Sequence, residues 1–501
     1  PSSKLAVIPK PNSFKDIPKA TLRIKEAILN KETITIVGDY DVDGVVSTSI
    51  IVDFFEKINY KVNYIIPNRF KHGYGLSTKI VDLIDEGLVI TVDNGIAAVA
   101  SSKLLKNKGI DLIITDHHTV GDELPEALAI VNPKQDDCNF PFKEICGAQV
   151  AWYLCASVKS ELNLDLNMAD FLDLLCVAII ADIMPMTSLN FTMVKQGLKK
   201  IKNSKRPAFI ELNACMRKDK FISDDIGFLI APKINSAGRM EDASTALKFL
   251  LSTNSNEAQD GLHALNDLND SRKKLQEQIS CKAMSEVDDN DSVIVVWGED
   301  WHEGVIGIVA SKLSNHFKKP AFVLSITDGV AKGSARSNGE ICLHELITQT
   351  KDLLLGFGGH KNAAGVSLRA ENLSAFKNNI NKIVRFNDKP LHNTIPTIGE
   401  LDVKSVDMEF ISIIEEFEPY GLENSKPIFH IQDAVILKEE FIGKEQNHLK
   451  LTLKIDGFIF DALKFHHNSK LNKDKINLIV AVNKNEFRGI CKAQFLIQDF
   501  V

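Results

Sequence analysis

The feature that most constrains the fold is a repeated alternation of short apolar runs and amphipathic stretches between residues 33 and 131. The intervening stretches, 45–57, 77–86 and 97–108, have the character of helices. Alternating strands and helices of this kind predict a parallel, doubly wound α/β sheet. The apolar runs are short, rich in β-branched residues and bounded by turn or acidic residues, as buried strands are: 33–38 (TITIVG), 62–67 (VNYIIP), 88–93 (LVITVD) and 111–115 (DLIIT).

The rest of the chain changes pattern several times. Residues 254–290 lack proline and carry leucine and isoleucine at helical spacing, which predicts a long connecting helix. A polar stretch with two prolines over 386–397 predicts a linker, and the two-residue alternation that follows it predicts a small β-barrel or sandwich. The expected parts are an α/β domain over 20–250, a connecting helix over 251–291, a second α/β domain over 292–386 and a β-rich domain over 396–501.

Composition excludes several classes of protein. The 59 basic and 66 acidic residues give a net charge of −7, so positive charge does not coat the whole chain, although one basic groove is enough to bind nucleic acid. The most apolar helix candidate has an uncharged stretch only over 174–181, far short of the ~20 residues of a membrane span. The eight cysteines are scattered without a CxxC pair, which argues against a disulfide framework or a zinc site. We therefore expect a reduced, cytoplasmic protein with no secretory signal and no membrane partner.

Acidic residues and histidines follow three of the predicted strands. Because the carboxyl ends of parallel strands share one edge of a sheet, we expect these side chains to converge there. A further acid, Asp182, interrupts the apolar helix candidate 174–186. The residues at the strand ends are Asp39, Asp41 and Asp43 after the first strand, Asp93 at the end of the third, and Asp116, His117 and His118 after the fourth.

Carboxylates gathered in this way repel one another and raise each other's pKa values unless cations lie among them. Carboxylate oxygen mixed with imidazole suits Mn²⁺, with Mg²⁺ as a substitute, and two ions about 3.5–4 Å apart can activate water and hold a phosphoryl group. Each motif alone has a plainer interpretation, because Asp after a strand often caps a helix and Asp-x-Asp-Gly often forms a turn. Asp182 alone also fits a hydrogen-bonded core carboxylate. Acids at three strand ends together favour the metal site.

These motifs resemble those of the DHH phosphoesterase family, named for the triplet at 116–118. Further matches are similar to the RecJ family of single-strand-specific 5′→3′ exonucleases, and the resemblance covers nearly the whole chain. The first group comprises GDYDVDG at 38–44, VDNG at 92–95, DHH at 116–118 and IIADIMP at 179–185. The second comprises PKINSAGRM at 232–240, WHEGVIGIVASKL at 301–313, KGSARS at 332–337, GFGGHKNAAG at 356–365 and PYGLENSKPIF at 419–429.

The resemblance implies roles for individual residues. His118 matches the residue that contacts the scissile phosphate, and Asp116 orients its neighbouring histidine. Many family members carry His at the position of Val37, so either one ion is held more loosely here or Asp39 takes over that role, directly or through water. The residues that match the metal ligands are Asp41, Asp43, Asp93, which bridges the ions, His117 and Asp182.

The resemblance also implies a pocket for a terminal 5′-phosphate, formed by Arg239, Ser334 and Arg336. Strand alternation puts Ser334 and Arg336 on one face, and the planar guanidinium group suits a phosphate anion. Each arginine would equally fit a surface ion pair.

Other candidate substrate contacts lie in loops. Arg69 and Tyr74, close to His72 after the second predicted strand, fit a phosphate contact and a base stack, or a solvated loop. Trp301 and His302 precede a predicted helix and fit a nucleotide contact, although tryptophan also serves as core filler. The last group, Gly358, Gly359 and His360, suits a close approach of phosphate or nucleobase, or a tight turn.

The C-terminal part has a split charge. Residues 399–423 carry a net charge of −7 and residues 424–498 a net charge of +4 with interleaved Phe, which fits a single-strand-binding barrel or a solvated lysine-rich face. The resemblance of residues 419–429 to the RecJ family implies that the domain over 396–501 is an OB-like β-barrel that binds nucleic acid, although the family usually shows Gly-Asn where this chain has Glu423-Asn424.

The expected function is a two-metal exonuclease that degrades single-stranded DNA from its 5′ end in DNA repair and recombination. We expect a monomer that prefers a 5′-phosphate and works with a single-strand-binding protein or a helicase. The alternatives are a DHH phosphodiesterase acting on oligoribonucleotides or cyclic dinucleotides, which would not need the barrel, and a non-catalytic replication scaffold, which would not need the acids.

Overall fold

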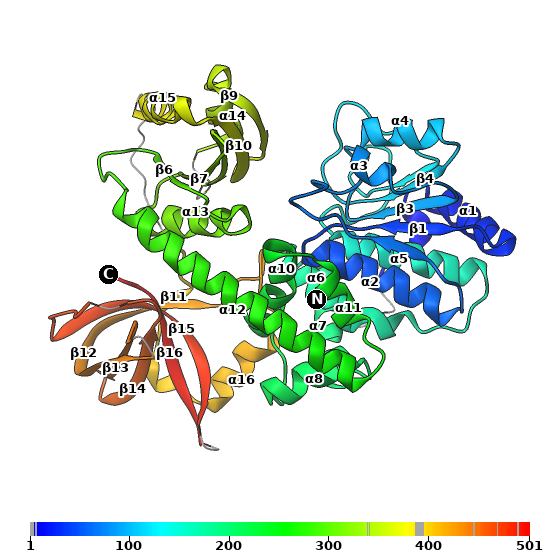
Figure 1. Cartoon of the computed structure of the whole chain (residues 1–501). Coiled ribbons are helices and arrows are strands. Elements are labelled where there is room, and N and C mark those ends of the chain that lie inside the picture. Colours follow the sequence, from blue (N-terminus) through cyan, green and yellow to red (C-terminus); the bar gives the residue numbers. More distant parts are fainter. Residues whose placement is uncertain are drawn as a thin grey trace.

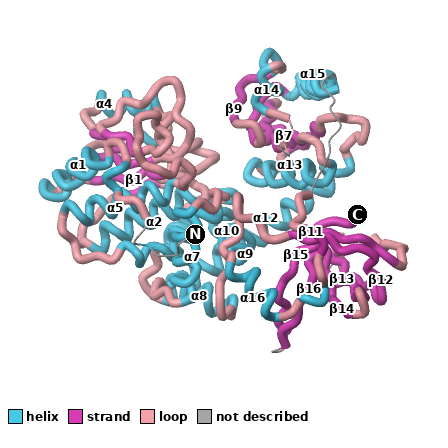
Figure 2. Tube along the Cα trace, turned by 180° about the vertical axis from the view of Figure 1, so that it is seen from behind, coloured by secondary structure: helices cyan, strands magenta, loops and turns pink. Residues whose placement is uncertain are grey.

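The structure, a computed structural model, describes residues 5, 8–337, 339, 341–385, 395–443, 446–467, 469–487 and 490–501. Most of the linker predicted over 386–397, from 386 to 394, lies outside these residues. Two α/β domains are joined by one long helix, and a barrel lies beside that helix (Figures 1 and 2).

The first domain is built on a fully parallel sheet with the strand order β2-β1-β3-β4-β5. Helices α1 (Ile17–Asn30), α2 (Val42–Lys57) and α5 (Gly147–Glu161) cover one face, while α3 (Thr78–Val81) and α4 (Val99–Asn107) cover the other (Figure 1). The predicted doubly wound sheet is therefore confirmed. Its strands are β1 (Ile34–Val37), β2 (Asn63–Ile65), β3 (Leu88–Val92), β4 (Asp111–Thr115) and β5 (Ala129–Val131).

Two helices differ from their predicted bounds. Helix α2 begins at Val42 rather than 45, because the Asp41 side chain accepts the Gly44 N–H at 3.0 Å and caps the helix. Helix α3 ends at Val81 rather than 86. The Lys108 ammonium group donates to the carbonyl oxygens of Val81 and Ile84 at 2.9 and 2.8 Å. These oxygens therefore receive their hydrogen bonds from a side chain and not from the N–H groups of a further helical turn.

The expectation that Asp182 lies inside a helix is wrong. Helix α6 (Leu172–Ala181) ends directly before it, and Ile183 adopts a left-handed φ of +54°. The N–H groups of Ile183 and Met184 donate to the carbonyl oxygens of Ile180 and Ile179 at 3.2 and 3.1 Å, which is the Schellman closure of a helix. Asp182 is thus the last residue before the chain turns away, and its carboxyl group lies at the end of the helix.

The connecting helix α12 (Ser255–Ser285) is 31 residues long and begins where the Asn254 side chain accepts the Glu257 N–H. Leu262 and Leu265 near its start lie in the core of the first domain, whereas Ile279 and Ala283 near its end lie in a core of the second. The helix is therefore anchored in both domains. The elements before it are α7 (Ser188–Lys202), α8 (Pro207–Met216), α9 (Ser223–Asp225), the π-helix η4 (Ile226–Ile230), α10 (Ala231–Met240) and α11 (Ser244–Leu250).

The second domain has a mixed sheet of order β6-β7-β8-β10-β9, in which only β6 and β7 are parallel. Its strands are β6 (Ile294–Glu299), β7 (Ala321–Thr327), β8 (Val330–Arg336), β9 (Leu354–Gly359) and β10 (Ala363–Arg369). Its helices are α13 (Glu303–Phe317), α14 (Leu343–Thr348) and α15 (Leu373–Arg385).

The C-terminal domain is a closed barrel, as predicted, because β12 pairs with both β13 and β15. Glu423, at the departure from the family's Gly-Asn pair, adopts a φ of +63°, the backbone conformation that glycine favours. Within the described residues, no helix has the length and apolar character to cross a bilayer. The elements are β11 (Gly399–Glu400), α16 (Met408–Glu416), β12 (Ile428–Ile442), β13 (His448–Ile455), β14 (Phe458–Lys464), β15 (Lys475–Phe487) and β16 (Ile490–Phe500).

An ion-pair network fixes α2 against α6. Arg206, directly before α8, places Nη2 2.9 Å from Oδ2 of Asp53 on α2, and Nε 3.7 Å from Oδ2 of Asp173 on α6. Both carboxylates are buried. The candidate acids Asp43 and Asp182 lie at the opposite ends of the same two helices.

We expect Arg206→Ala to destabilise the protein by about 3 kcal/mol, because it leaves the buried Asp173 carboxylate without a cation and leaves Asp53 with Lys57 alone. The measurement is urea unfolding, monitored through the fluorescence of the first domain. The control is Lys205→Ala, which changes an exposed neighbour. Equal unfolding midpoints for the two variants would contradict the role of the network.

Candidate active site

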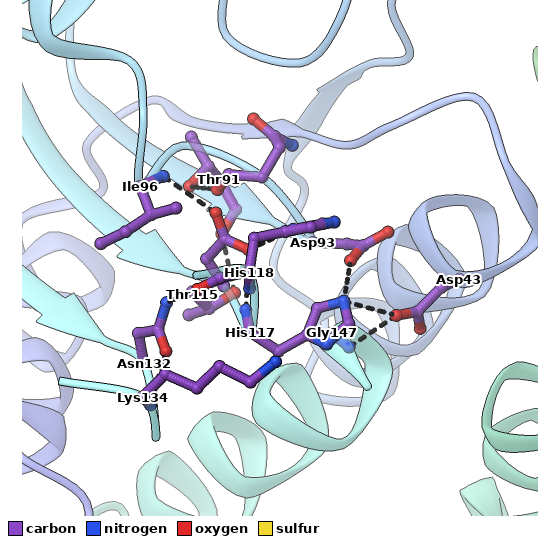
Figure 3. A network of polar contacts seen from close by, with 12 residues as sticks. Asp43, Thr91, Asp93, Ile96, Thr115, His117, His118, Asn132, Lys134 and Gly147 are labelled. Carbon is purple, nitrogen blue, oxygen red and sulfur yellow. Dashed lines mark hydrogen bonds and ion pairs between the residues drawn. The ribbon is translucent and has the colours of Figure 1, made fainter. Parts of the chain in front are cut away.

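The carboxyl ends of β1, β3 and β4 bring the predicted acids and histidines to one edge of the sheet (Figure 3). Asp43, in the first turn of α2, accepts the N–H groups of Gly147 and Ala148 at 2.6 and 2.9 Å. These groups form the start of α5, so the positive end of that helix holds the carboxylate in place. A Cβ atom on Gly147 would lie 2.5 Å from Asp93 Oδ1, so only glycine permits this approach.

His117 lies at the centre of the acids and is buried. Its Nε2 atom lies 3.1 Å from Asp93 Oδ1, 3.6 Å from Asp182 Oδ2 and 3.7 Å from Asp43 Oδ2. These contacts join the ends of β3 and β4, the start of α2 and the end of α6, so segments far apart in the sequence meet at one imidazole ring.

Potential ligand atoms form three overlapping groups, each with its atoms within 4.8 Å of one another. Four buried atoms in these groups have no hydrogen-bond partner among the residues that the structure describes: Asp39 Oδ1, Asp93 Oδ1, Asp182 Oδ2 and His117 Nδ1. Buried polar atoms without partners are rare in folded proteins, and oxygen and imidazole ligands suit Mn²⁺ or Mg²⁺. The residues present therefore fit divalent cations. The groups are Asp39, Asp41 and Asp93; Asp43, His117 and Asp182; and Asp93, His117 and His118.

The pKa shifts of the clustered acids and of His117 also favour a site for divalent cations. Burial, followed by repulsion from neighbouring carboxylates, raises the pKa of Asp39, Asp41 and Asp93, and raises the pKa of Asp182 to about 8. Burial lowers the pKa of His117, which keeps the ring in the neutral form that ligates metals. Cations among these groups would remove the repulsion.

The pair Asp116 and His118 is arranged differently. Asp116 Oδ1 accepts His118 Nδ1–H at 2.7 Å, and Oδ2 accepts the Ile96 N–H at 2.8 Å. Burial raises the pKa of Asp116, but its hydrogen bonds to His118 and to the backbone outweigh this effect and lower it. Burial lowers the pKa of His118, but the Asp116 carboxylate outweighs it and raises that pKa to about 9. His118 is therefore a cation at neutral pH, held in one orientation.

The loop after β2 lies beside the acids, as expected. The Arg69 guanidinium group stacks on the Tyr40 ring at 4.3 Å, and Tyr74 Oη lies 3.4 Å from both the Asp93 carbonyl oxygen and His118 Nε2. His72 instead accepts the Asn68 N–H at 3.1 Å and so stabilises the loop itself.

The arginines expected to bind a phosphate come together from two domains. Arg239, at the end of α10, donates to the Gly304 carbonyl oxygen at 3.2 Å, and Arg336 donates to Ser334 Oγ at 3.0 Å. Burial and the nearby Arg69 and Arg336 lower the pKa of Arg239 to about 10. In the described part of the chain none of these arginines makes an ion pair, so the cluster is an uncompensated positive charge suited to an anion.

The remaining expected substrate contacts, all in the second domain, differ in their surroundings. Trp301 is only 7% exposed and packs against Gly298 in a core of the second domain, so its ring supports the fold and does not face a nucleotide. His302 caps α13 through the Gly304 N–H and meets the Phe70 ring of the first domain edge-on at 5.6 Å. Gly358, Gly359 and His360 are exposed on the hairpin of β9 and β10.

Sequence reasoning missed Asn94. Its amide nitrogen donates to the carbonyl oxygens of Val37, Gly38 and Val92 at 3.1, 3.0 and 2.8 Å, which ties the ends of β1 and β3 together behind the acids. The VDNG motif contains this residue, but the sequence does not show which carbonyl groups its side-chain amide binds. Gly147 was missed for the same reason, because its close approach to Asp93 is a tertiary contact.

Comparisons with known proteins agree with this geometry. Three family models match: DHH family, N-terminal domain, over residues 33–179, the DHHA1 domain over 290–385 and the RecJ OB domain over 399–499. The crystal structure of RecJ from Thermus thermophilus in complex with Mn²⁺ superposes with a TM-score of 0.86 at 28% identity, covering 99% of this chain and 72% of that one. The structure of the same protein with Mg²⁺ gives a TM-score of 0.79 at 26% identity, covering 99% and 71%.

Two curated relatives carry the name single-stranded-DNA-specific exonuclease RecJ. The protein of Bacillus subtilis (strain 168) is 36% identical over 507 residues, which cover 98% of this chain and 64% of that relative, so this chain spans less than two thirds of its length. The protein of Haemophilus influenzae is 33% identical over 522 residues, which cover 97% of this chain and 91% of that relative. With this identity over nearly the full length of both proteins, the chain belongs to the RecJ family of DHH phosphoesterases.

Proposed function

We propose that this protein is a metal-dependent exonuclease that degrades single-stranded DNA from its 5′ end in DNA repair and recombination. The observation that carries the proposal is the pairing of two features. Acids and histidines form three groups that could ligate cations, two of which share Asp93, and next to them lies an arginine cluster that makes no ion pair with the residues that the structure describes. A phosphodiester chain with a terminal phosphate is an anion that can occupy both features at once.

In this proposal Asp39, Asp41 and Asp93 would hold one ion, and Asp43, His117 and Asp182 would hold the other, with Asp93 Oδ1 lying 3.1 Å from His117 Nε2 of the second group. Mn²⁺, or Mg²⁺ in its place, would supply Lewis-acid chemistry for phosphodiester hydrolysis there. Val37 points into the core between the sheet and α3, away from the acids, so the unpartnered Oδ1 of Asp39 is better placed to serve where other family members carry histidine.

His118 would bind the non-bridging oxygens of the scissile phosphate. Its ring is cationic, because the Asp116 carboxylate raises its pKa to about 9, and its Nε2 atom is directed away from Asp116. A hydrogen bond from a cation to a phosphoryl oxygen strengthens as negative charge develops in the transition state. Asp116 acts through His118 and is a positioning residue, while Tyr74 can stack on the adjacent base.

Arg239, Ser334 and Arg336, with Arg69, would bind the terminal 5′-phosphate. Arg69 and Arg239 belong to the first domain and Arg336 to the second, so the strand end would lie between the two α/β domains. His302 and the exposed turn of Gly358, Gly359 and His360 border the second domain's side of the substrate path in this proposal.

The barrel would hold the strand beyond the active site, which favours long single strands over oligoribonucleotides or cyclic dinucleotides. We further propose a division at 20–250, 251–291, 292–386 and 396–501, a monomeric state, and cooperation with a single-strand-binding protein or helicase that supplies unpaired DNA. All eight cysteines are free, which favours a reducing compartment such as the cytoplasm.

We expect Asp93→Asn to lower the Mn²⁺-dependent release of nucleotides by about 10³-fold, because the shared ligand loses its charge. The measurement is hydrolysis of a 5′-phosphorylated single strand labelled at its 3′ end. The variant should still bind the strand, as measured by fluorescence anisotropy. Asp85→Asn, an exposed acid of the same domain, is the control and should retain full activity.

Metal binding should depend on pH through Asp182. Its pKa of about 8 in the metal-free folded protein lies above the ordinary value of 3.8, so between these values the folded state binds more protons than the unfolded state. The contribution of this group to metal-free stability therefore falls as pH rises through that window, and Mn²⁺ must displace the proton at lower pH.

We accordingly expect Mn²⁺ to raise the melting temperature more at pH 8 than at pH 6. Differential scanning fluorimetry of chelator-treated protein checks this, and Asp182→Asn should flatten the difference between the two pH values. Equal shifts at both pH values in the unchanged protein would contradict the role of Asp182.

Arg336→Ala should weaken the preference for a 5′-phosphate. Loss of one charge-assisted contact of about 1.5–3 kcal/mol corresponds to a decrease of about 10- to 100-fold in kcat/KM for phosphorylated strands. On strands with a 5′-hydroxyl group, the variant and the unchanged protein should be equally active. An equal loss on both substrates would show that Arg336 does not bind the terminal phosphate.

A further inference from the structure

Ile183 occupies an unfavourable position next to a metal-ligand candidate. It is the left-handed residue of the Schellman closure of α6, with φ at +54°, directly after Asp182. That position favours glycine, and a β-branched residue there is strained. The side chain is 68% exposed, so burial does not compensate for the strain. Neither backbone preference nor core packing accounts for isoleucine at this point, and strain of this kind gathers at functional sites.

Phe228 lies in a second unusual element that packs on the same helix end. It belongs to the π-helix η4, and among the large apolar side chains of the described residues it is the most exposed, at 76%. A Cβ atom on the adjacent Gly227 would lie 3.7 Å from Ile180 Cγ2, in the last turn of α6. Short π-helical turns occur often at functional sites.

The two side chains lie where the first domain meets the segment that leads into the barrel. The Met186 N–H donates to the Leu422 carbonyl oxygen at 2.7 Å, and a Cβ atom on Gly421 would lie 2.9 Å from Met186 Cε. Ser223, just before η4, donates to Glu418 at 3.1 Å. Leu229, next to Phe228, and Leu422, bound to Met186, are further exposed apolar residues of these segments.

We propose that Ile183 and Phe228 form a platform for the bases just downstream of the scissile phosphate. This inference rests on the proposed function and adds a specific contact to it. A single strand is the occupant that fits, because its phosphates would bind the cations that the acids could hold, while its apolar base faces would contact the neighbouring side chains. Contacts to base faces tolerate any sequence, as a general exonuclease requires.

The test combines protein variants with substrates that lack single bases. Phe228→Ala, Ile183→Gly and the control Leu29→Ala, an equally exposed residue (68%) of α1, are compared with the unchanged protein. The probes are 5′-phosphorylated DNA strands with one abasic position moved along the first ten or so nucleotides. Initial hydrolysis rates are measured with Mn²⁺, and strand affinity is measured by anisotropy in the presence of a chelator.

We expect Phe228→Ala and Ile183→Gly to lower the rate and affinity for intact strands by about tenfold, the usual effect of losing one base contact. In the unchanged protein, an abasic site at one or two positions should lower the rate and affinity by a similar factor. An abasic site at those same positions should leave the rate and affinity of Phe228→Ala unchanged. Leu29→Ala should behave as the unchanged protein. Because glycine relieves the left-handed strain, Ile183→Gly should not lower the melting temperature, which separates lost contact from lost folding.

The platform is overturned if Phe228→Ala and Ile183→Gly bind intact and abasic strands with the affinities of the unchanged protein. This affinity measurement does not depend on hydrolysis. Absence of Mn²⁺-dependent nucleotide release from the unchanged protein would instead overturn the proposed function, so the two failures are distinguishable.

Discussion

Repulsion among buried carboxylates is the constraint on which the rest of the first domain depends. Asp41 and Asp93 lie together with Asp43, and burial and mutual repulsion raise the pKa values of the first two. The fold holds the acids by backbone groups: the start of α5 binds Asp43, and the capped start of α2 binds Asp41. Such an arrangement is stable when divalent cations share the site. The ligands lie at helix starts and strand ends because backbone groups are free to bind side chains there.

A second constraint is the distance between the two α/β domains. Helix α12 is rooted in both cores, and it keeps the second domain facing the acids. Across the gap Arg239 binds the Gly304 carbonyl group and Phe70 meets His302. The positive cluster of arginines therefore faces the negative cluster of acids at a fixed separation. In the proposed function, a strand end bound by the arginines would present its first phosphodiester bond to the acids.

The sequence predicted the first sheet, the connecting helix and the barrel because hydrophobic period and β-branched content are local signals. It predicted the convergence of Asp93, His117 and Asp43 because parallel strands share a carboxyl edge. For Trp301 it left a nucleotide contact and core filling open, and the burial of Trp301 against Gly298, a contact that no local pattern reports, decided for the core. It was wrong for Asp182, because the helix before it closes on hydrogen bonds made by Ile183 and Met184. Asn94 and Gly147 were missed because their roles are contacts between segments distant in the chain.

The amino-acid sequence by itself therefore determined the architecture and the chemical type of the site, since element periodicity and residue type suffice for both. Only the tertiary structure decided which atoms meet. It paired His118 with Asp116 and so made that ring a cation, while it placed the neighbouring His117 among carboxylates and kept that ring neutral. Two adjacent histidines thus differ in charge. The groups that surround each side chain in space set its free energy of protonation, and the neighbouring residues in the sequence do not.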